Sequence, residues 1–416
     1  METKILLVTH YYRDANPARA EELDAAFAEN AKIVESLGDS ASMLVLSYNT
    51  LQAPHGRVEV NEVFNRPAVD DYIAEANARA NSDTLVVLAN SDVVIPATAY
   101  LKALGHKFAN EVMALTRWEP EGIYEGGEVS QDVWMWKGKI HTLGLKAPLG
   151  MVGVDNVMAG LFKRRGYEVS NYACSIRTFH RHASGVRNYN PKERVEGPTF
   201  FPIPVALPQP VRDRVLIVVP HCNDLHPDCR AAIDREKVDG IEQVMPMRGS
   251  ATDMKFRTQY SIGSTINRNR ARAESLATDA SHFLFVDSDV VIPEGAVAKL
   301  RSHDLPIVAG WYPFHSADLW CAGVWTDASH LHRFARPRPG LETVDFAGLG
   351  CMLIRREVLE GMTFPHGWDK KAFGEGNQPI VWGPCVAFCH QAAELGFKTH
   401  VDGDVICEHR RREHGC

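Results

Sequence analysis

Two carboxylates, one residue apart, follow a strongly apolar stretch in the second half of the chain. Residues 283–286 read Phe-Leu-Phe-Val, and Asp287 and Asp289 come directly after them. Such a run predicts a strand in the buried centre of a sheet, and open α/β sheets bind ligands beyond the carboxyl ends of such strands. Carboxylates exposed there can hold a divalent cation that bridges a diphosphate. The competing interpretation is a turn in which an aspartate caps the next segment.

The same pattern occurs in the first half. Ser91–Pro96 recurs letter for letter as Ser288–Pro293, and an apolar run, Leu85–Leu88, again precedes it. The halves also open alike, because Lys4–His10 parallels Arg214–His221. Matched landmarks in one order predict a tandem duplication.

Each half also closes in the same way. A glycine and an aromatic residue lead into a strand and then a histidine, from Gly166 to His180 and from Gly396 to His409. Between the halves, residues 198–210 contain five prolines, which neither a helix nor a central strand accepts. We therefore expect a first domain at 1–197, a semi-rigid linker at 198–212 and a second domain at 213–416.

Helical patterns alternate with the apolar runs. Residues 18–37, 69–80 and 270–280 have helical character, and the first places its apolar residues on one face: Leu23, Phe27, Ala31, Val34 and Leu37. Strands that alternate with helices predict an α/β fold with a mostly parallel sheet covered on both faces.

Composition narrows the classes of protein. The 416 residues are 45% hydrophobic and carry a net charge of −7, which disfavours a disordered chain and a strongly basic nucleic-acid binder. We see no secretory signal and no apolar run of the roughly 20 residues that a membrane span needs. Nine scattered cysteines favour reduced thiols and a cytoplasmic location. No Walker or GxGxxG loop is present.

The chain resembles the GT-A nucleotide-sugar glycosyltransferases, in particular members from phages and environmental genomes. In the second half the resemblance lies in Ile266–Asn269, Phe285–Asp289, Val308–Pro313, Phe346–Arg356 and Val401–His409. In the first half it lies in Leu88–Asp92, Gln131–Trp134, Gly153–Asn156 and Ser175–His182.

The resemblance implies two tandem GT-A-like, Rossmann-related domains and a metal-dependent transferase. Its donor would be a nucleotide-diphosphate sugar, and its cation Mn²⁺ or Mg²⁺. The implied metal ligands are Asp92, His180 and His182 in the first half and Asp287, Asp289 and His409 in the second. The implied donor-binding residues are Asn90, Asp92, Asp287, Asp289, Arg268, Asn269, His10 and His221. Because Asn90 replaces the first aspartate of the DxD motif, a cation in the first half would depend mainly on Asp92 and a terminal histidine.

In an inverting member of this family, a carboxylate near a helix start deprotonates the acceptor hydroxyl. Asp155, 25 residues before His180, is the candidate, although it could instead cap a helix. The same count back from His409 reaches Pro384, beside Cys385, and neither supplies a base; Glu375 is a nearby substitute, as is Asp369. Both sites could work, one could be degenerate, or the alignment could shift here. We favour catalysis in the first half.

The acceptor remains open. Asp132, Trp134 and Gly350 are candidate acceptor residues, although a tryptophan here could equally belong to the core. A glycan and the 5-hydroxymethyl group of a pyrimidine in phage DNA are both candidate acceptors. The alternative to an enzyme is a carbohydrate-binding or assembly module made of degenerate transferase domains. A zinc site formed by Cys407, His409, His414 and Cys416 does not match a closed structural spacing.

Overall fold

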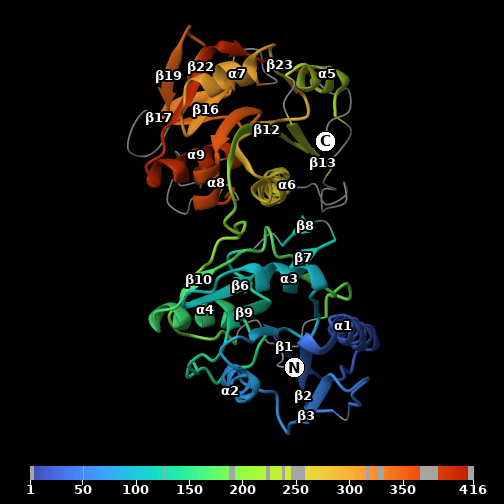
Figure 1. Cartoon of the computed structure of the whole chain (residues 1–416). Coiled ribbons are helices and arrows are strands. Elements are labelled where there is room, and N and C mark those ends of the chain that lie inside the picture. Colours follow the sequence, from blue (N-terminus) through green and yellow to red (C-terminus); the bar gives the residue numbers. More distant parts are fainter. Residues whose placement is uncertain are drawn as a thin grey trace. The chain divides into compact units, whose positions relative to one another are not determined.

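The computed structural model describes residues 4–49, 51–120, 122–124, 127–186, 193–221, 225–236, 239–244, 258–314, 319–325, 332–365 and 383–410, with the backbone alone for 221, 239–244, 258–264 and 332–333. The chain forms two compact units, Met1–Leu207 and Pro208–Cys416. Both are mixed α/β units with mostly parallel central sheets (Figure 1).

Unit 1 is built on a seven-stranded sheet of order β10-β6-β9-β4-β1-β2-β3. Neighbouring strands are parallel except at β9, which runs antiparallel to both β4 and β6. The strands are β1 (Ile5–Tyr11), β2 (Ala41–Ser47), β3 (Val58–Glu62), β4 (Leu85–Ala89), β6 (Glu111–Leu115), β9 (Val133–Lys137) and β10 (Glu168–Ser170).

Helices cover both faces of this sheet because successive strand residues point to opposite sides. On one face, Leu6 and Val8 pack with residues of α2 (Val69–Arg79) and α4 (Val154–Arg164). On the other, Ile5 and Leu7 pack with α1 (Pro17–Ser36) and α3 (Ala97–Gly105). The expected apolar face of residues 18–37 lies in this second core, with Leu23, Ala31 and Val34 buried.

A second, small sheet lies beyond the carboxyl end of β4. Its order is β5-β11-β7-β8, formed by β5 (Val93–Val94), β11 (Phe179–His180), β7 (Trp118–Glu119) and β8 (Gly122–Ile123). The pairing of His180 with Val93 brings the closing histidine of this half beside its Ser91–Pro96 motif.

The proline-rich segment packs against unit 1. The backbone N–H of Phe200 donates to the carbonyl of Asn156, and the N–H of Val205 donates to the carbonyl of Asn171. A Cβ on Gly160 would lie 2.1 Å from the carbonyl oxygen of Pro198, so α4 needs a glycine where this segment crosses it.

Unit 2 has a seven-stranded sheet of order β13-β12-β14-β21-β16-β22-β19. Its antiparallel pairs are β14 and β16 with β21, and β19 with β22. The strands are β12 (Arg212–His221), β13 (Asp239–Val244), β14 (Ala280–Val286), β16 (Ile307–Trp311), β19 (Leu341–Val344), β21 (Cys351–Arg355) and β22 (Thr399–Ile406).

The remaining elements of unit 2 surround this sheet. Its helices are α5 (Pro227–Arg235), α6 (Thr258–Leu276), α7 (Ala296–Ser302), α8 (Arg356–Gly361) and α9 (Pro384–Glu394). The short strands are β15 (Val290–Val291) with β23 (Glu408–His409), and β17 (Ala322–Trp325) between β18 (His332–Phe334) and β20 (Phe346–Ala347). The helix expected at 270–280 begins earlier and ends at Leu276, because Ala280 already starts β14.

The two units repeat one arrangement of six strands. The order β2-β1-β4-β9-β6-β10 in unit 1 matches β13-β12-β14-β21-β16-β22 in unit 2. In both, the strand before the repeated motif lies beside an antiparallel neighbour, and the closing histidine pairs with the short strand inside the motif. Equivalent positions of the two units can therefore be compared directly.

Candidate metal and transfer site

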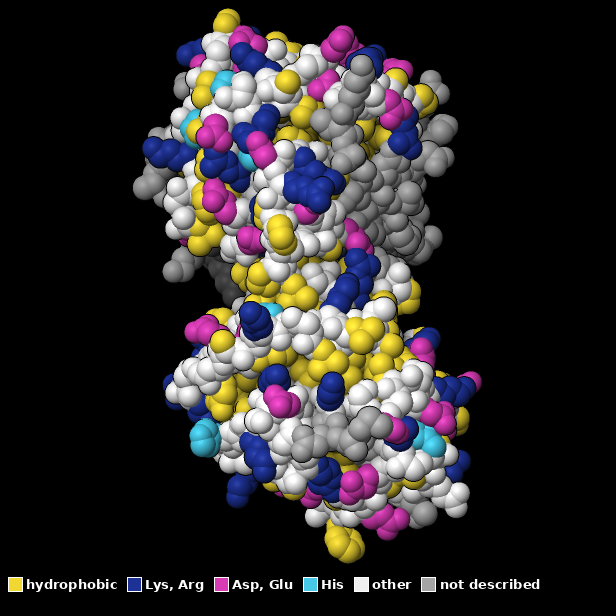
Figure 2. All heavy atoms as spheres, viewed as in Figure 1, with side chains coloured by type: hydrophobic (Ala, Val, Ile, Leu, Met, Phe, Trp, Pro, Cys, Tyr) yellow, Lys and Arg dark blue, Asp and Glu magenta, His cyan; other side chains and the backbone are white. Residues whose placement is uncertain are grey.

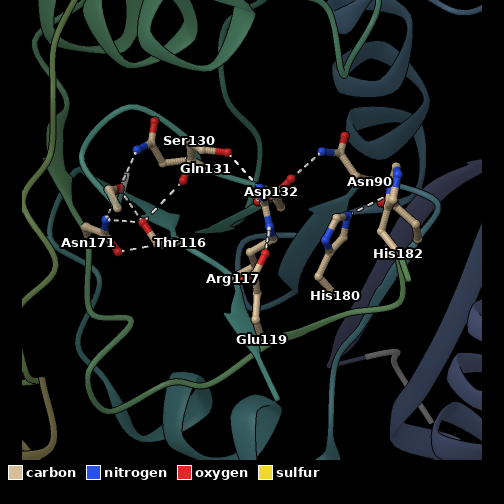
Figure 3. A network of polar contacts seen from close by, with 12 residues as sticks. Asn90, Thr116, Arg117, Glu119, Ser130, Gln131, Asp132, Asn171, His180 and His182 are labelled. Atoms are coloured by element: carbon tan, nitrogen blue, oxygen red, sulfur yellow. Dashed lines mark hydrogen bonds and ion pairs between the residues drawn. The ribbon is translucent and has the colours of Figure 1, made fainter. Parts of the chain in front are cut away.

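Asp92 and two histidines meet beyond the carboxyl end of β4. His180 Nε2 lies 3.0 Å and His182 Nδ1 3.5 Å from Asp92 Oδ2. The β5–β11 pairing places His180 there, and the Arg181 N–H donates to the Asp92 carbonyl. Because alternate residues share a face of an extended segment, His182 follows His180 toward the carboxylate (Figure 3).

Asp92 is more enclosed than the sequence predicts. Its side chain is about nine-tenths buried, and Arg19 Nη2 lies 2.5 Å from Oδ2. Burial raises the pKa of Asp92, but hydrogen bonds from His180 and His182 and the charge of Arg19 outweigh it, so the pKa lies well below its usual range. The carboxylate is therefore ionised at neutral pH. The side chain of Asp92 contacts Arg19, His180 and His182.

The donor atoms of this cluster fit a divalent cation. One ligand atom each from Asp92, His180 and His182 lies within 4.8 Å of the others, the one such group in the described part of the chain. Ligands bound to one ion at about 2.0–2.2 Å are themselves about 3–4 Å apart, so the observed separations need little adjustment. Two imidazoles and a carboxylate suit Mn²⁺ and other transition metals better than Mg²⁺, which prefers oxygen ligands.

A polar chain begins at Asn90, two residues before Asp92, and crosses the ends of β4 and β9. Asn90 Nδ2 donates to Asp132 Oδ1 over 2.9 Å, and Arg117 Nη1 donates to Asp132 Oδ2 over 2.9 Å. Arg117 also bonds Ser130 and stacks on the ring of Tyr124. Figure 3 shows Asp132 between Asn90 and Arg117, with His180 and His182 close to each other nearby.

Asp155 lies next to this chain, at the second residue of α4. Gly153 precedes the helix with φ +81° and is its N-cap residue, so Asp155 does not cap the helix. Burial and the charge of Asp132 raise the pKa of Asp155 well above its usual value, although a hydrogen bond from the Gln131 N–H and the charge of Arg117 oppose this. Its Oδ1 atom is buried without a hydrogen-bond partner among the described residues. Such a carboxylate has the properties of a general base.

Aromatic rings line the ends of β1 and β2. The rings of His10 and Tyr12 are nearly parallel with centroids 5.9 Å apart, and those of Tyr12 and Tyr48 are parallel at 5.6 Å. Burial and Arg66 lower the pKa of His10 to about 3, which keeps the imidazole neutral. Because His10 also senses the charges of Asp92 and Arg19, the predicted donor-binding residue lies near the cluster.

The equivalent residues of unit 2 are arranged differently. Asp287 Oδ1 accepts from Arg268 Nη2 over 2.9 Å, whereas Asp289 Oδ2 lies 3.5 Å from His409 Nε2. The Nδ1–H of His409 donates to the Pro313 carbonyl over 2.8 Å. Both carboxylates are partly exposed, as the sequence predicts, but the two face different partners.

Three predicted site residues have structural contacts instead. Trp134 lies in the core against Phe162 and is almost fully buried, so it cannot stack on an acceptor. The amide of Asn269 is used on both sides by the Phe364 backbone. Gly350 is a glycine because a Cβ would lie 2.8 Å from the ring of Tyr312, whose hydroxyl also accepts from its N–H.

Other predictions lie outside the described residues. Glu375 and Asp369 belong to 366–382, and His414 and Cys416 to the last six residues, while His221 is described by its backbone alone. Conversely, the sequence analysis missed Arg19, Glu22 and Arg117. No motif marks them, since each reaches the site only through the packing of α1 or the small sheet.

The comparisons with known proteins add little. No protein-family model matches the chain, and no curated protein matches it in sequence. Among solved structures, A197 from STIV is similar at 17% identity and TM-score 0.32, over 48% of this chain and 87% of its own. GalNAc-T7 with UDP, GalNAc and Mn²⁺ is similar at 13% identity and TM-score 0.31, over 49% of this chain and 44% of its own.

This chain thus spans less than half of the GalNAc-T7 chain. Among the helices that the structure describes, none has the length and apolar character of a bilayer span.

Proposed function

We propose that this chain is a metal-dependent glycosyltransferase whose chemistry takes place in unit 1. It moves a sugar from a nucleotide-diphosphate donor to an acceptor hydroxyl. The observation that carries the proposal is the pairing of two features at one sheet edge. A cluster of ligand atoms lies at Asp92, His180 and His182. Two residues before Asp92, Asn90 bonds Asp132, whose charge acts on a buried, incompletely bonded carboxylate, Asp155.

Each part of this edge has a role in such a transfer. Asp92, His180 and His182 would hold a divalent cation, which would supply positive charge to stabilise the departing diphosphate. Asp155 accepts the proton of the acceptor hydroxyl as that oxygen attacks the sugar carbon. Asp132 keeps the pKa of Asp155 high, and Arg117 limits this effect. The neutral ring of His10 and the stacked Tyr12 and Tyr48 offer a surface for the nucleotide base.

The donor set favours Mn²⁺ over Mg²⁺. Of three protein ligands, two are imidazole nitrogens, and Mg²⁺ selects oxygen. We therefore expect activity to depend on Mn²⁺, with Mg²⁺ a poor substitute.

The acceptor is a glycan or a 5-hydroxymethylpyrimidine in DNA, and the charge on the faces visible in Figure 2 does not favour either. Figure 2 shows basic and acidic side chains interspersed on the viewed face of each unit, among the residues that it colours. A DNA acceptor would thus need a local contact with phosphate, and its affinity would fall steeply with salt.

A second candidate function has its own support. Arg19 lies on Asp92 at 2.5 Å, and Arg268 on Asp287 at 2.9 Å, so an arginine neutralises one motif carboxylate in each unit. A degenerate, carbohydrate-binding or assembly module would keep arginines where an active transferase binds a metal ion. This module predicts binding of sugars or nucleotides without turnover.

One experiment separates the two. The protein and Mn²⁺ are incubated with a panel of nucleotide sugars and offered hydroxymethylcytosine DNA, hydroxymethyluracil DNA and simple glycans, and mass spectrometry identifies the products. The transferase predicts a single glycosylated product that Asp92→Asn and Asp155→Asn abolish and Cys385→Ala preserves. Binding of a donor or glycan without product would favour the module.

A further inference from the structure

Arg19 occupies an unusual position for a cation. It is the third residue of α1, whose first turn is fixed by Asn16, which accepts hydrogen bonds from the N–H groups of Ala18 and Arg19. The positive end of a helix dipole disfavours a cation there. The guanidinium is nevertheless almost fully buried, with Nη2 at 2.5 Å from Asp92 and Nη1 at 3.1 Å from Glu22. Its position therefore depends on those two carboxylates.

The contact with Asp92 uses the atom that the histidines face. Arg19 Nη2, His180 Nε2 and His182 Nδ1 all approach Asp92 Oδ2. A divalent cation bound by Asp92 and both imidazoles would bring two further positive charges beside the guanidinium. Like charges repel strongly where water is largely excluded, so the cation and Arg19 cannot both keep full contact with this carboxylate.

We propose that Arg19 is an internal counter-ion that competes with the divalent cation for Asp92 and is released from it when the cation binds. The inference rests on the metal site proposed above. It makes Arg19 a positioning residue, which orients the Asp92 carboxylate until a cation binds.

The surroundings of Arg19 indicate what the released guanidinium binds. Its Nε and the Nδ1 of His10 are buried without hydrogen-bond partners among the described residues, and His10 senses the charges of Arg19 and Arg66. Buried polar atoms of this kind are costly unless an acceptor satisfies them. A diphosphate supplies such oxygens, so cation binding and diphosphate binding are coupled through Arg19.

Mn²⁺ binding to the full chain tests this directly. The free Mn²⁺ signal in electron paramagnetic resonance is titrated for the wild type, Arg19→Gln, Arg19→Lys, Glu22→Gln and Asp92→Asn. Removing the competing charge should tighten Mn²⁺ binding by about 10- to 100-fold in Arg19→Gln, as expected when a buried carboxylate loses its partner. Glu22→Gln leaves the contact between Arg19 and Asp92 in place and should not tighten Mn²⁺ binding. Asp92→Asn should abolish Mn²⁺ binding.

Thermal unfolding gives a second reading. Without Mn²⁺, Arg19→Gln should unfold at a lower temperature than the wild type, because Asp92 is left without its counter-ion. Adding Mn²⁺ should raise the unfolding temperature of the variant back to that of the wild type. With inorganic pyrophosphate as the probe, Mn²⁺ should strengthen binding to the wild type at least about fivefold more than to Arg19→Gln.

The outcomes are distinguishable. One result overturns this inference and leaves the metal site intact. In that result Arg19→Gln binds Mn²⁺ no more tightly than the wild type does, while Asp92→Asn abolishes the binding. A purely structural role for Arg19 predicts that result. No Mn²⁺ binding by either protein overturns both proposals. If Arg19→Gln does not fold, Arg19→Lys, which keeps the charge but loses the planar fork, should bind Mn²⁺ more tightly than the wild type, and unchanged affinity contradicts the inference.

Discussion

The two units place different residues on one six-stranded arrangement. In both, the first residue of the DxD-like motif donates its backbone N–H to the carbonyl of the residue that precedes the antiparallel strand. Asn90 donates to Asp132 in unit 1, and Asp287 donates to Gly350 in unit 2. At the second residue of the following 11-residue helix, unit 1 has Asp155 and unit 2 has Cys385. Unit 1 thus has the candidate base with an incomplete motif, and unit 2 has the complete motif without a carboxylate at this helix position.

Charge compensation explains why unit 1 has Asn90 where unit 2 has Asp287. Asn90 lies against the carboxylate of Asp132 and donates a hydrogen bond to it. An aspartate there would face a second carboxylate. In unit 2 the neighbour is Gly350, which carries no charge, and Arg268 neutralises Asp287. The incomplete motif of unit 1 is therefore the form compatible with Asp132, and it need not indicate decay.

The closing histidines differ as well. Unit 1 has His180 and His182, whereas unit 2 has His409 followed by Arg410 and Arg411. Unit 2 therefore has an arginine at the sequence position that corresponds to His182, and Asp287 is already paired with Arg268. We infer that a transition metal prefers unit 1, although unit 2 has the complete sequence motif.

The largest effect should come from the base. Asp155→Asn should lower the rate of transfer by about 10²- to 10⁴-fold, because it removes proton acceptance and little volume. Rates at saturating donor and acceptor measure this. The matched change in unit 2, Cys385→Ala, should leave the rate unchanged. The reverse pattern would place the chemistry in unit 2.

The metal ligands should give the next effect. His180→Ala should weaken Mn²⁺ binding by more than the roughly 10- to 100-fold typical of losing a residue that only supports a ligand. Isothermal titration calorimetry measures the affinity. His409→Ala is the control in unit 2 and should bind one Mn²⁺ as the wild type does. Equal losses in both variants would contradict a preference for unit 1.

Restoring the motif in unit 1 should destabilise the protein. Asn90→Asp places a carboxylate against Asp132 and should lower the free energy of unfolding by about 1–3 kcal/mol at neutral pH. The folded-state pKa of the pair is raised, so the cost should grow as the pH rises above about 4. Denaturant unfolding at several pH values measures it, and adding Asp132→Asn should recover most of the loss. A stable single variant would refute the compensation argument.

The smallest effect concerns stability at Asp155. Its pKa is raised by burial and by Asp132, so the folded protein holds this proton more tightly than the unfolded chain. Stability from this group is full below the unfolded pKa of about 4 and is lost as the pH rises through the folded pKa. Asp155→Asn should therefore stabilise the protein by about 1 kcal/mol at neutral pH and by less at pH 4. A uniform change across pH would mean that Asp155 is not strained by its charge.

The sequence predicted what depends on local pattern. The apolar runs became central strands, and the repeated motif with the closing histidines marked the residues that meet at Asp92. The sequence does not show which side chains are held by packing. Trp134 fills the core, Gly350 makes room for Tyr312, and Asn269 braces Phe364. Arg19 could not be found, because its contact with Asp92 spans 73 residues and depends on how α1 lies over the sheet.

Anomalous diffraction from crystals grown with Mn²⁺ tests the central claim most directly. The account predicts a manganese peak bound at once by Asp92, His180 and His182, at about 2.0–2.2 Å from each ligand atom, with Arg19 moved away from Asp92. A peak between Asp287, Asp289 and His409, with none at Asp92, would contradict it.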